Sequence, residues 1–225
     1  MDIHKPKPWH GWAEFVKEIG TIVIGVLIAL GGEQAVEWAH QQHELSEARD
    51  ALHDEVVKDA TAIRIMALEN RCQLGEYDRA MAWAKGGPRP PLMTNVIFPA
   101  PGDGVWESLK SGPVSHMPLK EKLAYVEFYY QVANNRSFYG PMRDQSIGLA
   151  SYLALDSLTP AEARSLVRDI SRQQRILTVM LRNAPFELAA ARKAGGEPLP
   201  LTPADRATIE AECAVSGTLF DETGL

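Results

Sequence analysis

The sequence predicts an all-α protein in which one N-terminal transmembrane helix continues into a long helical stalk and a helical bundle. Three observations support this fold class. A run of fourteen uncharged, mostly apolar residues lies close to the N-terminus. Downstream, apolar residues recur every three or four positions, which is the spacing of one helix face. Finally, no stretch of useful length alternates apolar and polar residues, as a β-strand would.

The composition limits the classes of function. With 225 residues, the chain is long enough for one ordinary domain plus an appendage. A net charge of −6 without clustered lysine and arginine disfavours a nucleic-acid surface. The sequence also lacks a P-loop, a dinucleotide fingerprint and a nucleophile elbow. We therefore expect no nucleic-acid partner, no cofactor and no catalytic residues.

The uncharged run covers residues 19–32 (IGTIVIGVLIALGG) and is shorter than the ~20 residues that a membrane-spanning helix usually needs. Tryptophans at positions 9, 12 and 38 flank it, where the aromatic belts of a membrane helix lie. A helix from Trp12 to Trp38 is about 39 Å long, close to the ~40–45 Å of a bilayer with its headgroups. We predict a transmembrane helix over residues 15–38. Its interfacial anchors are Trp9, Trp12, Lys17 and Trp38.

Two other interpretations of this run remain open. The sequence Ala29-Leu30-Gly31 resembles the small-residue cleavage site of a signal peptide. A buried helix of a soluble protein has a similar length. An in-plane amphipathic helix fits less well, because the run is apolar on all sides.

Basic residues near the ends of the run predict its orientation. Lys5, Lys7 and Lys17 precede it, whereas only Arg49 lies within the next twenty residues. The positive-inside rule then places residues 1–14 in the cytoplasm and residues 39–225 in the periplasm of a Gram-negative cell. We expect a single-pass protein of the bacterial inner membrane.

Small residues recur along one side of the predicted membrane helix: Thr21, Gly25, Ala29 and Gly32. Such a face lets two helices approach closely in lipid. Glycine and alanine are also simply common in membrane helices, so the pattern has an ordinary explanation as well. We expect contact with a second copy or with another inner-membrane protein through this face.

After the membrane segment, proline is absent until position 88, and Gly75 is the only glycine before position 86. This pattern predicts one long helix to about Lys85, with a break expected, if anywhere, at Gly75. Gly86-Gly87-Pro88 is a firm stop signal. Residues 86–118 are rich in proline and glycine and predict a long irregular loop, with a short helix over 105–110.

Four further helices are predicted from local signals. Two are expected over 118–133 and 141–155. A third begins at Thr159, which is followed by Pro160 and Glu162 in a capping-box pattern, and ends at Gly195-Gly196. The last begins at Thr202 and extends to about Ala214. The third carries a coiled-coil-like stripe and a kink expected before Pro185; it is long enough to pair antiparallel with the stalk. The stripe consists of Leu166, Ile170, Gln173, Leu177, Met180, Ala184 and Leu188.

Two segments, EIGTIVIGVLIAL and VWESLKSGPVSHMPLKEKLAYVEFYY, resemble an uncharacterised family of bacterial single-span inner-membrane proteins. That family has a glycine-bearing N-terminal membrane helix and a helical soluble domain. Trp106, Ser111-Gly112 and Tyr129-Tyr130 match its second pattern, and the similarity covers about a third of the chain. The family has no known activity, so the resemblance implies a topology and no catalytic residue.

The two cysteines, Cys72 and Cys213, lie too far apart in sequence for a CxxC motif. In an oxidising periplasm they are candidates for a disulfide that clips the last helix to the stalk. The alternative is two separate buried thiols.

A histidine and carboxylate cluster follows the membrane segment and includes the Glu-x-x-His spacing of di-iron bundles. Such a site needs a second motif of this kind, which the sequence lacks, so we expect no metal and a solvated face with i,i+4 pairs. The cluster comprises Glu37, His40, His43, Glu44, Glu47 and His53.

Aromatic residues concentrate between positions 125 and 139, near two arginines. We interpret the aromatic residues as core, with a ligand pocket that binds an anion as the weaker hypothesis. The aromatic residues are Tyr125, Phe128, Tyr129, Phe138 and Tyr139, and the arginines are Arg136 and Arg143.

Taken together, these features favour a membrane-anchored periplasmic interaction or scaffold protein. It would self-associate or serve as an accessory subunit of an inner-membrane complex. A ligand-binding bundle of the sensor type is the alternative. An enzyme is disfavoured, since no motif supports one.

Overall fold

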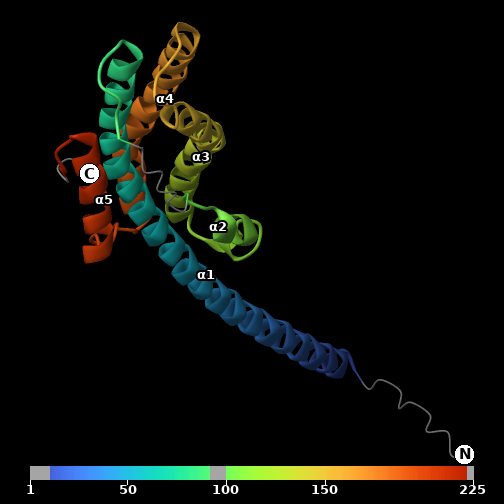
Figure 1. The fold of residues 1–225 in the computed structure, drawn as a ribbon. Helices are drawn as coiled ribbons and strands as arrows, with labels where there is room; N and C mark the ends of the chain where they lie inside the picture. The colour runs from blue at the N-terminus through green and yellow to red at the C-terminus, as the bar shows by residue number, and fades with distance from the viewer. Residues whose placement is uncertain (1–10, 92–99, 222–225) are drawn as a thin grey trace, which may run out of the picture. The chain divides into compact units, whose positions relative to one another are not determined.

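The computed structural model describes residues 11–91 and 100–221, except for the side chains at positions 139, 141, 143–147 and 153. Over these residues the chain is helical and contains no strand, so the all-α prediction is confirmed (Figure 1). The helices are α1 (Trp12–Ala84), α2 (Gly104–Leu109), the 3-10 helix η1 (Pro113–His116), α3 (Leu119–Leu153), α4 (Pro160–Lys193) and α5 (Pro203–Ser216).

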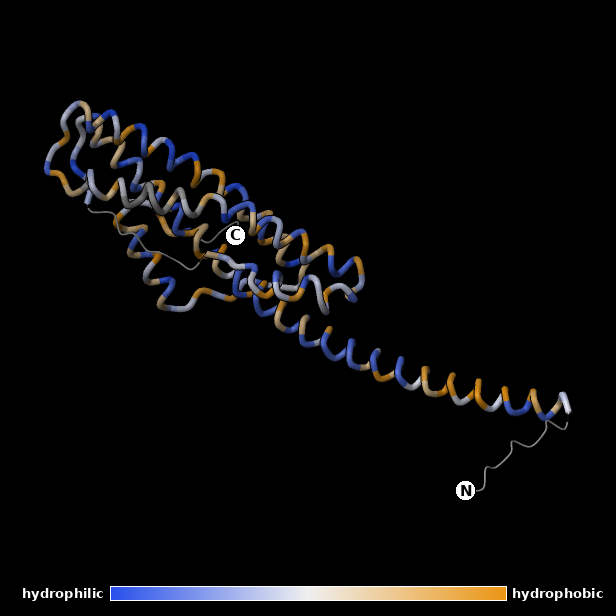
Figure 2. Tube along the Cα trace, turned by 90° about the vertical axis from the view of Figure 1, so that its right-hand side faces the viewer, coloured by the Kyte–Doolittle hydropathy of each residue, from blue (hydrophilic) through white to orange (hydrophobic). Residues whose placement is uncertain are grey.

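The chain divides into two compact units, residues 1–47 and residues 48–225. In the first unit, the described structure is the N-terminal part of α1. That part is long and apolar enough to cross a membrane by length and composition, and none of its apolar window is buried. Figure 2 shows its turns of apolar residues.

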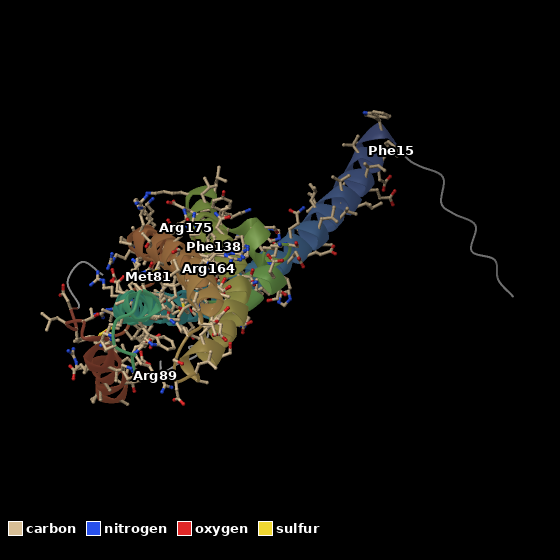
Figure 3. All side chains as sticks on the ribbon, turned by 45° about the horizontal axis from the view of Figure 1, so that its top comes forward. Phe15, Met81, Arg89, Phe138, Arg164 and Arg175 are labelled. Carbon is tan, nitrogen blue, oxygen red and sulfur yellow. A yellow bond between two sulfur atoms is a disulfide. The ribbon has the colours of Figure 1, made fainter. Side chains whose placement is uncertain are left out.

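In the second unit, the later part of α1 packs with α3 and α4. Tyr77, Ala80 and Trp83 of α1 form one buried apolar cluster with residues of α3 and α4, and Met81, labelled in Figure 3, packs against it. The other members of the cluster are Leu149, Leu166, Ile170 and Leu177.

Contacts along these helices give their directions. Asp78 of α1 accepts a hydrogen bond from Gln174, whereas Val56 packs against Gly196 just beyond α4. Higher numbers on α1 therefore meet lower numbers near α4, and the two helices are antiparallel as the sequence predicts. α4 is also antiparallel to α3, since Lys193 bonds Glu127 and Gln173 bonds the carbonyl of Met142.

α5 packs on α1 away from this cluster. Ile65, Leu68 and Cys72 of α1 form a second buried cluster with Ile209 and Cys213 of α5. Thr61 of α1 accepts a hydrogen bond from the backbone N–H of Leu199, which precedes α5, whereas Cys72 pairs with Cys213 near the end of α5. Residue numbers therefore rise together on both helices, and α5 runs parallel to α1.

The prediction of separate helices over 118–133 and 141–155 is wrong, because α3 runs unbroken from Leu119 to Leu153. Pro141 removes one backbone donor and normally clashes with the turn before it. The preceding residue is Gly140, and because glycine has no Cβ, the restriction that a proline places on the residue before it is reduced. Burial of Val132 and Leu149 on either side holds the helix together through this point.

The long helix predicted to about Lys85 is confirmed, since α1 runs through Gly75 to Ala84 without a break. A Cβ at Gly75 would lie 2.2 Å from Thr218 Oγ1 and 3.2 Å from the carbonyl oxygen of Ser216. Because Gly75 has no Cβ, the end of α5 and the residues that follow it can pack closely against α1 at this point.

The predicted helix starts at Thr159 and Thr202 are confirmed, since each threonine forms a capping box, with Glu162 and Asp205. α4 continues through Pro185 and ends at Lys193. Gly195 then adopts a φ of +88°, which favours glycine.

Candidate functional site

The small-residue face of the first unit is made by Thr21, Gly25, Ala29 and Gly32. At about 100° per residue, these four positions fall within an arc of about 80° on α1. A Cβ added to Gly25 or Gly32 would meet no atom within 4 Å. The Thr21 hydroxyl donates to the carbonyl of Lys17 at 2.9 Å, so its donor is satisfied within the helix. The face is smooth, uncharged and open to close approach by another helix.

Of the four predicted interfacial anchors, Trp9 lies outside the described residues. Trp12, Lys17 and Trp38 are exposed on α1. The rings of Trp12 and Phe15 are 5.6 Å apart, so the amino end of the helix carries an aromatic pair.

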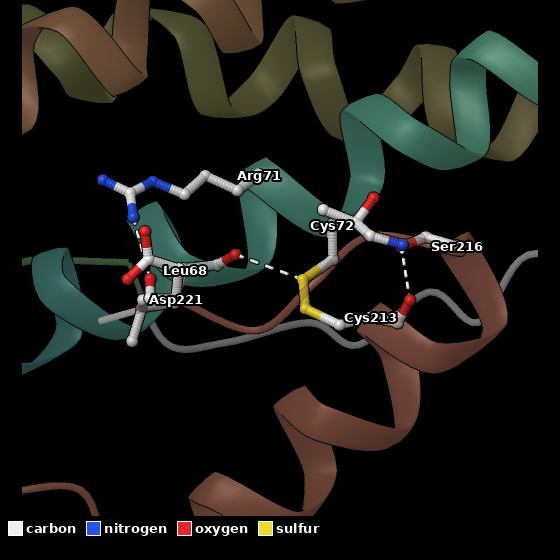
Figure 4. Close-up of a disulfide and its surroundings, with 7 residues drawn as sticks. Leu68, Arg71, Cys72, Cys213, Ser216 and Asp221 are labelled. Atoms are coloured by element: carbon white, nitrogen blue, oxygen red, sulfur yellow. Dashed lines mark hydrogen bonds between the residues drawn. A yellow bond between two sulfur atoms is a disulfide. The ribbon is translucent and has the colours of Figure 1, made fainter. Parts of the chain in front are cut away.

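The two cysteines lie at disulfide distance, with their Cα atoms 4.7 Å apart, and both are buried (Figure 4). The pair joins α1 to α5 across 141 positions of sequence. Two contacts beside it tie down the same region. Arg71 donates to the backbone carbonyl of Asp221 at 2.8 Å, and Arg79 donates to that of Val215.

Three glutamates lie near the cysteines along their own helices: Glu69 and Glu76 on α1, and Glu212 on α5. Burial, and next the charge of Glu212, raises the pKa of Glu69 to about 9 and that of Glu76 to about 7. Burial also raises the pKa of Glu212. Over the described residues, no group of three His, Cys, Asp or Glu side chains could hold a metal ion. The glutamates line a seam between two helices, and holding protons there lowers their repulsion.

A second polar site joins α1 to the α2 segment and α3. Glu55 of α1 accepts hydrogen bonds from the backbone N–H groups of Val105 and Trp106, at 2.9 and 3.2 Å, and from the Tyr129 hydroxyl at 2.7 Å. The first two donors belong to the first turn of α2, where backbone N–H groups have no acceptor within the helix. Trp106 stacks on Tyr129 with ring centroids 5.1 Å apart.

One turn further along α1, Asp59 accepts a hydrogen bond from the backbone N–H of Gly102 at 3.1 Å. Burial raises the pKa of Asp59 to about 7, the charge of Glu55 adds to this, and the Gly102 bond opposes it. Arg136 of α3 forms an ion pair with Asp103 at 2.7 Å. These contacts fix the start of α2 onto α1 and α3.

The structure brings together Trp106 and Tyr129, two residues of the resembled motif. Ser111-Gly112 lies between α2 and η1, where the N–H of Gly112 donates to the carbonyl of Leu109. Tyr130 is exposed. The motif therefore marks the docking of α2 onto α3.

The histidine and carboxylate cluster forms exposed pairs along α1. His40 lies 3.1 Å from Glu44, and His43 lies 3.4 Å from Glu47, each at i,i+4 spacing. Glu37 accepts from Gln41 at 3.0 Å. The side chains pair along a solvated face.

Tyr125, Phe128 and Tyr129 are buried, as the core interpretation of the aromatic residues predicts. Arg136 pairs with Asp103. The side chains of Tyr139 and Arg143 lie outside the described part of the chain.

Sequence reasoning missed Glu55, Asp59 and the buried contact of Asn135 with Glu187. Glu55 and Asp59 share one helix face at i,i+4 spacing. Their backbone partners lie in and just after the loop near Gly102, and no sequence pattern predicts which carboxylate the backbone N–H groups of such a loop will bind.

No protein-family model, no curated protein and no solved structure matches this chain. Of the resemblance noted from the sequence, the structure shows a long N-terminal apolar helix followed by helical segments. What the chain does is therefore inferred from its own geometry.

Proposed function

We propose that this chain is a membrane-anchored periplasmic scaffold, which self-associates or serves as an accessory subunit of an inner-membrane complex. One observation carries the proposal. The same helix, α1, bears an unburied apolar stretch with an open glycine face and then forms the spine of a helical bundle. The N-terminal part of α1 provides the membrane anchor and the contact surface, and it keeps the helical bundle next to the membrane.

The proposed orientation places residues 1–14 in the cytoplasm and the bundle in the periplasm. Lysines before the membrane segment support it through the positive-inside rule. The cysteine pair at disulfide distance supports it independently, since disulfides persist in oxidising compartments. The resembled family of inner-membrane proteins has the same proposed topology.

The glycine-bearing face supports an assembly role. Lipid tails are as apolar as the side chains of a membrane helix, so no hydrophobic effect drives two helices together in lipid. Their association depends instead on close packing, which small residues allow. On this face Gly25 is central and open, so a larger residue there should keep a second helix at a distance.

Purification of the full chain in a mild detergent, with measurement of the mass of the complex, tests the proposal. We expect a mass above one copy, from self-association or a retained partner, and its loss in Gly25→Leu. Gly20→Leu is the matched control, because it makes the same change on another side of α1, also in open space. A wild-type chain that is a strict monomer and retains no partner overturns the proposal.

A further inference from the structure

One face of α3 is apolar, large and unpartnered within the described structure. Leu119, Leu123, Val126 and Tyr130 have exposed fractions of 70%, 53%, 43% and 64%. Their spacing of four, three and four is that of successive d and a positions in a coiled coil. We call these four residues the α3 stripe. It lies opposite the side on which Phe128 and Val132 are buried in the bundle.

The charges beside the α3 stripe suit a second copy of the same helix. With Leu119 at a d position, Lys122 occupies a g position and Glu127 the e position of the next heptad. In a parallel pair of helices, a g residue faces the e residue five positions later on the partner. Lys122 of each copy then meets Glu127 of the other, which gives two opposite-charge contacts by symmetry.

Both side chains are accessible for such contacts. The Lys122 ammonium donates to the carbonyl of Ser115 at 3.0 Å in an exposed position. Glu127 forms a surface ion pair with Lys193 at 2.7 Å, and exposed pairs of this kind contribute little to stability. Redirecting either group toward a second copy therefore costs little.

We propose that the α3 stripe is a self-association surface, on which α3 of a second copy packs in parallel. An antiparallel pair would also bring Lys120 near Glu127. However, α3 runs in the same direction as the α1 segment of its own unit, since Arg49 and Glu55 contact Glu121 and Tyr129 in that order. Only a parallel pair leaves the amino ends of both α1 segments on the same side, as two chains anchored in one membrane require.

This inference rests on the proposed function, because anchoring in one membrane selects the parallel arrangement and raises the effective concentration of the copies. It adds a second contact surface, in the bundle, to the glycine-bearing face of the membrane segment. The two surfaces are tested separately below.

Cross-linking of single-cysteine positions in membranes tests the arrangement, after the native cysteine pair has formed. In a parallel pair each residue meets its own copy, so Leu119→Cys and Tyr130→Cys should each cross-link with a short bismaleimide. In an antiparallel pair Leu119 faces Tyr130, and two copies of Leu119→Cys lie about 16 Å apart. Glu210→Cys, exposed on α5, is the control that should not cross-link.

A charge exchange tests the predicted contact between Lys122 and Glu127. Lys122→Glu alone and Glu127→Lys alone each replace two attractions by two repulsions, and should weaken association by about tenfold. Mixing the two variants restores opposite charges at both contacts and should recover the wild-type association. A thermal melt of each variant should match that of the wild type, because both residues are on the surface of the bundle.

The outcomes separate this inference from the proposed function. Cross-links at positions 119 and 130, together with recovery on mixing, support the parallel stripe. Cross-linking only when Leu119→Cys and Tyr130→Cys are mixed overturns the parallel arrangement. A complex above one copy in mass without any stripe cross-link overturns the inference and leaves the proposed function standing. A strict monomer without a partner overturns both.

Discussion

Glu55 shows how one carboxylate organises the junction of three helices. It accepts three hydrogen bonds, two from backbone groups at the start of α2 and one from the Tyr129 hydroxyl. Asp103, at the N-cap position of α2, makes no side-chain cap bond. Glu55, which is far from α2 in the sequence, therefore accepts hydrogen bonds from backbone N–H groups that an N-cap side chain usually satisfies.

Removing the Tyr129 hydroxyl should weaken this junction. Tyr129→Phe deletes one hydrogen bond to a carboxylate and should lower the free energy of unfolding by about 1–3 kcal/mol. For a chain of this size that corresponds to a fall in Tm of about 2–4 °C per kcal/mol. Tyr130→Phe is the matched control, since Tyr130 is exposed and should melt like the wild type. Equal melting of both variants would contradict the role given to Glu55.

Asp59 makes the stability of the bundle depend on pH. Burial raises its folded-state pKa to about 7 from an ordinary value of 3.8. Between these values the folded chain holds a proton that the unfolded chain has lost, so stability falls as pH rises from about 4 to 7. The stabilisation that this bound proton gives is fully present below about pH 4. It is lost as the pH rises through about 7, and above that pH Asp59 no longer changes the stability.

Asp59→Asn should therefore reduce the loss of stability between pH 4 and pH 7, because the amide keeps an acceptor for Gly102 without a titrating group. Urea unfolding at several pH values measures this. Burial likewise raises the pKa of Glu76 and Glu187 to about 7, so part of the slope should remain. Asp54→Asn, an exposed change on the same helix, should leave the slope as in the wild type. An unchanged slope in Asp59→Asn would contradict the assignment.

At this scale, the sequence indicated Trp106 and the paired tyrosines but not their partner. Aromatic residues are visible as a pattern, and their burial follows from their size. Glu55 looks like any solvated glutamate of a long helix, because only the fold brings the start of α2 to it.

At the scale of the elements, α5 depends on close approach at one glycine. In Gly75→Ala the new Cβ would meet the Thr218 hydroxyl, which can rotate away, and the backbone oxygen of Ser216 at 3.2 Å, which moves less easily. We expect the variant to lower the Tm. Gly148→Ala in α3, where a Cβ meets nothing within 4 Å, should instead raise stability by about 0.5–1 kcal/mol. A Tm increase in both variants would show that the end of α5 does not pack as described.

The cysteine pair should hold α5 to α1. Joining positions 141 apart stabilises by up to about 4–5 kcal/mol in the chain-entropy model. Cys72→Ser combined with Cys213→Ser should lower the urea midpoint and increase hydrogen exchange in 203–216 first, with α3 and α4 less affected. The same exchange pattern in the wild type and the double variant would contradict a clipping role.

Helix starts could be predicted from the sequence where the signal is local. Thr159 and Thr202 are followed by proline and an acidic residue, and both form capping boxes. Helix interruptions were less predictable. Pro141 and Gly75 are breaking residues by local propensity, yet packing on both sides carries α3 and α1 through them. Local rules cannot weigh such tertiary packing.

At the scale of the whole molecule, α1 connects two units with different surfaces. The first unit exposes an apolar helix with a small-residue face, and the second buries a core around the same helix. Soluble proteins rarely expose a contiguous apolar surface such as that of the first unit. The proposed account explains this by placing that stretch in lipid and the bundle in the periplasm.

The most direct test of this account is the accessibility of introduced cysteines in intact cells. A maleimide that cannot cross the inner membrane should label Glu210→Cys in the bundle from the periplasmic side. It should label Glu14→Cys, before the membrane segment, only after the inner membrane is lysed, and the chain should stay in the membrane through an alkaline wash. Labelling of Glu210→Cys only after lysis, or release of the chain by the wash, would contradict the account.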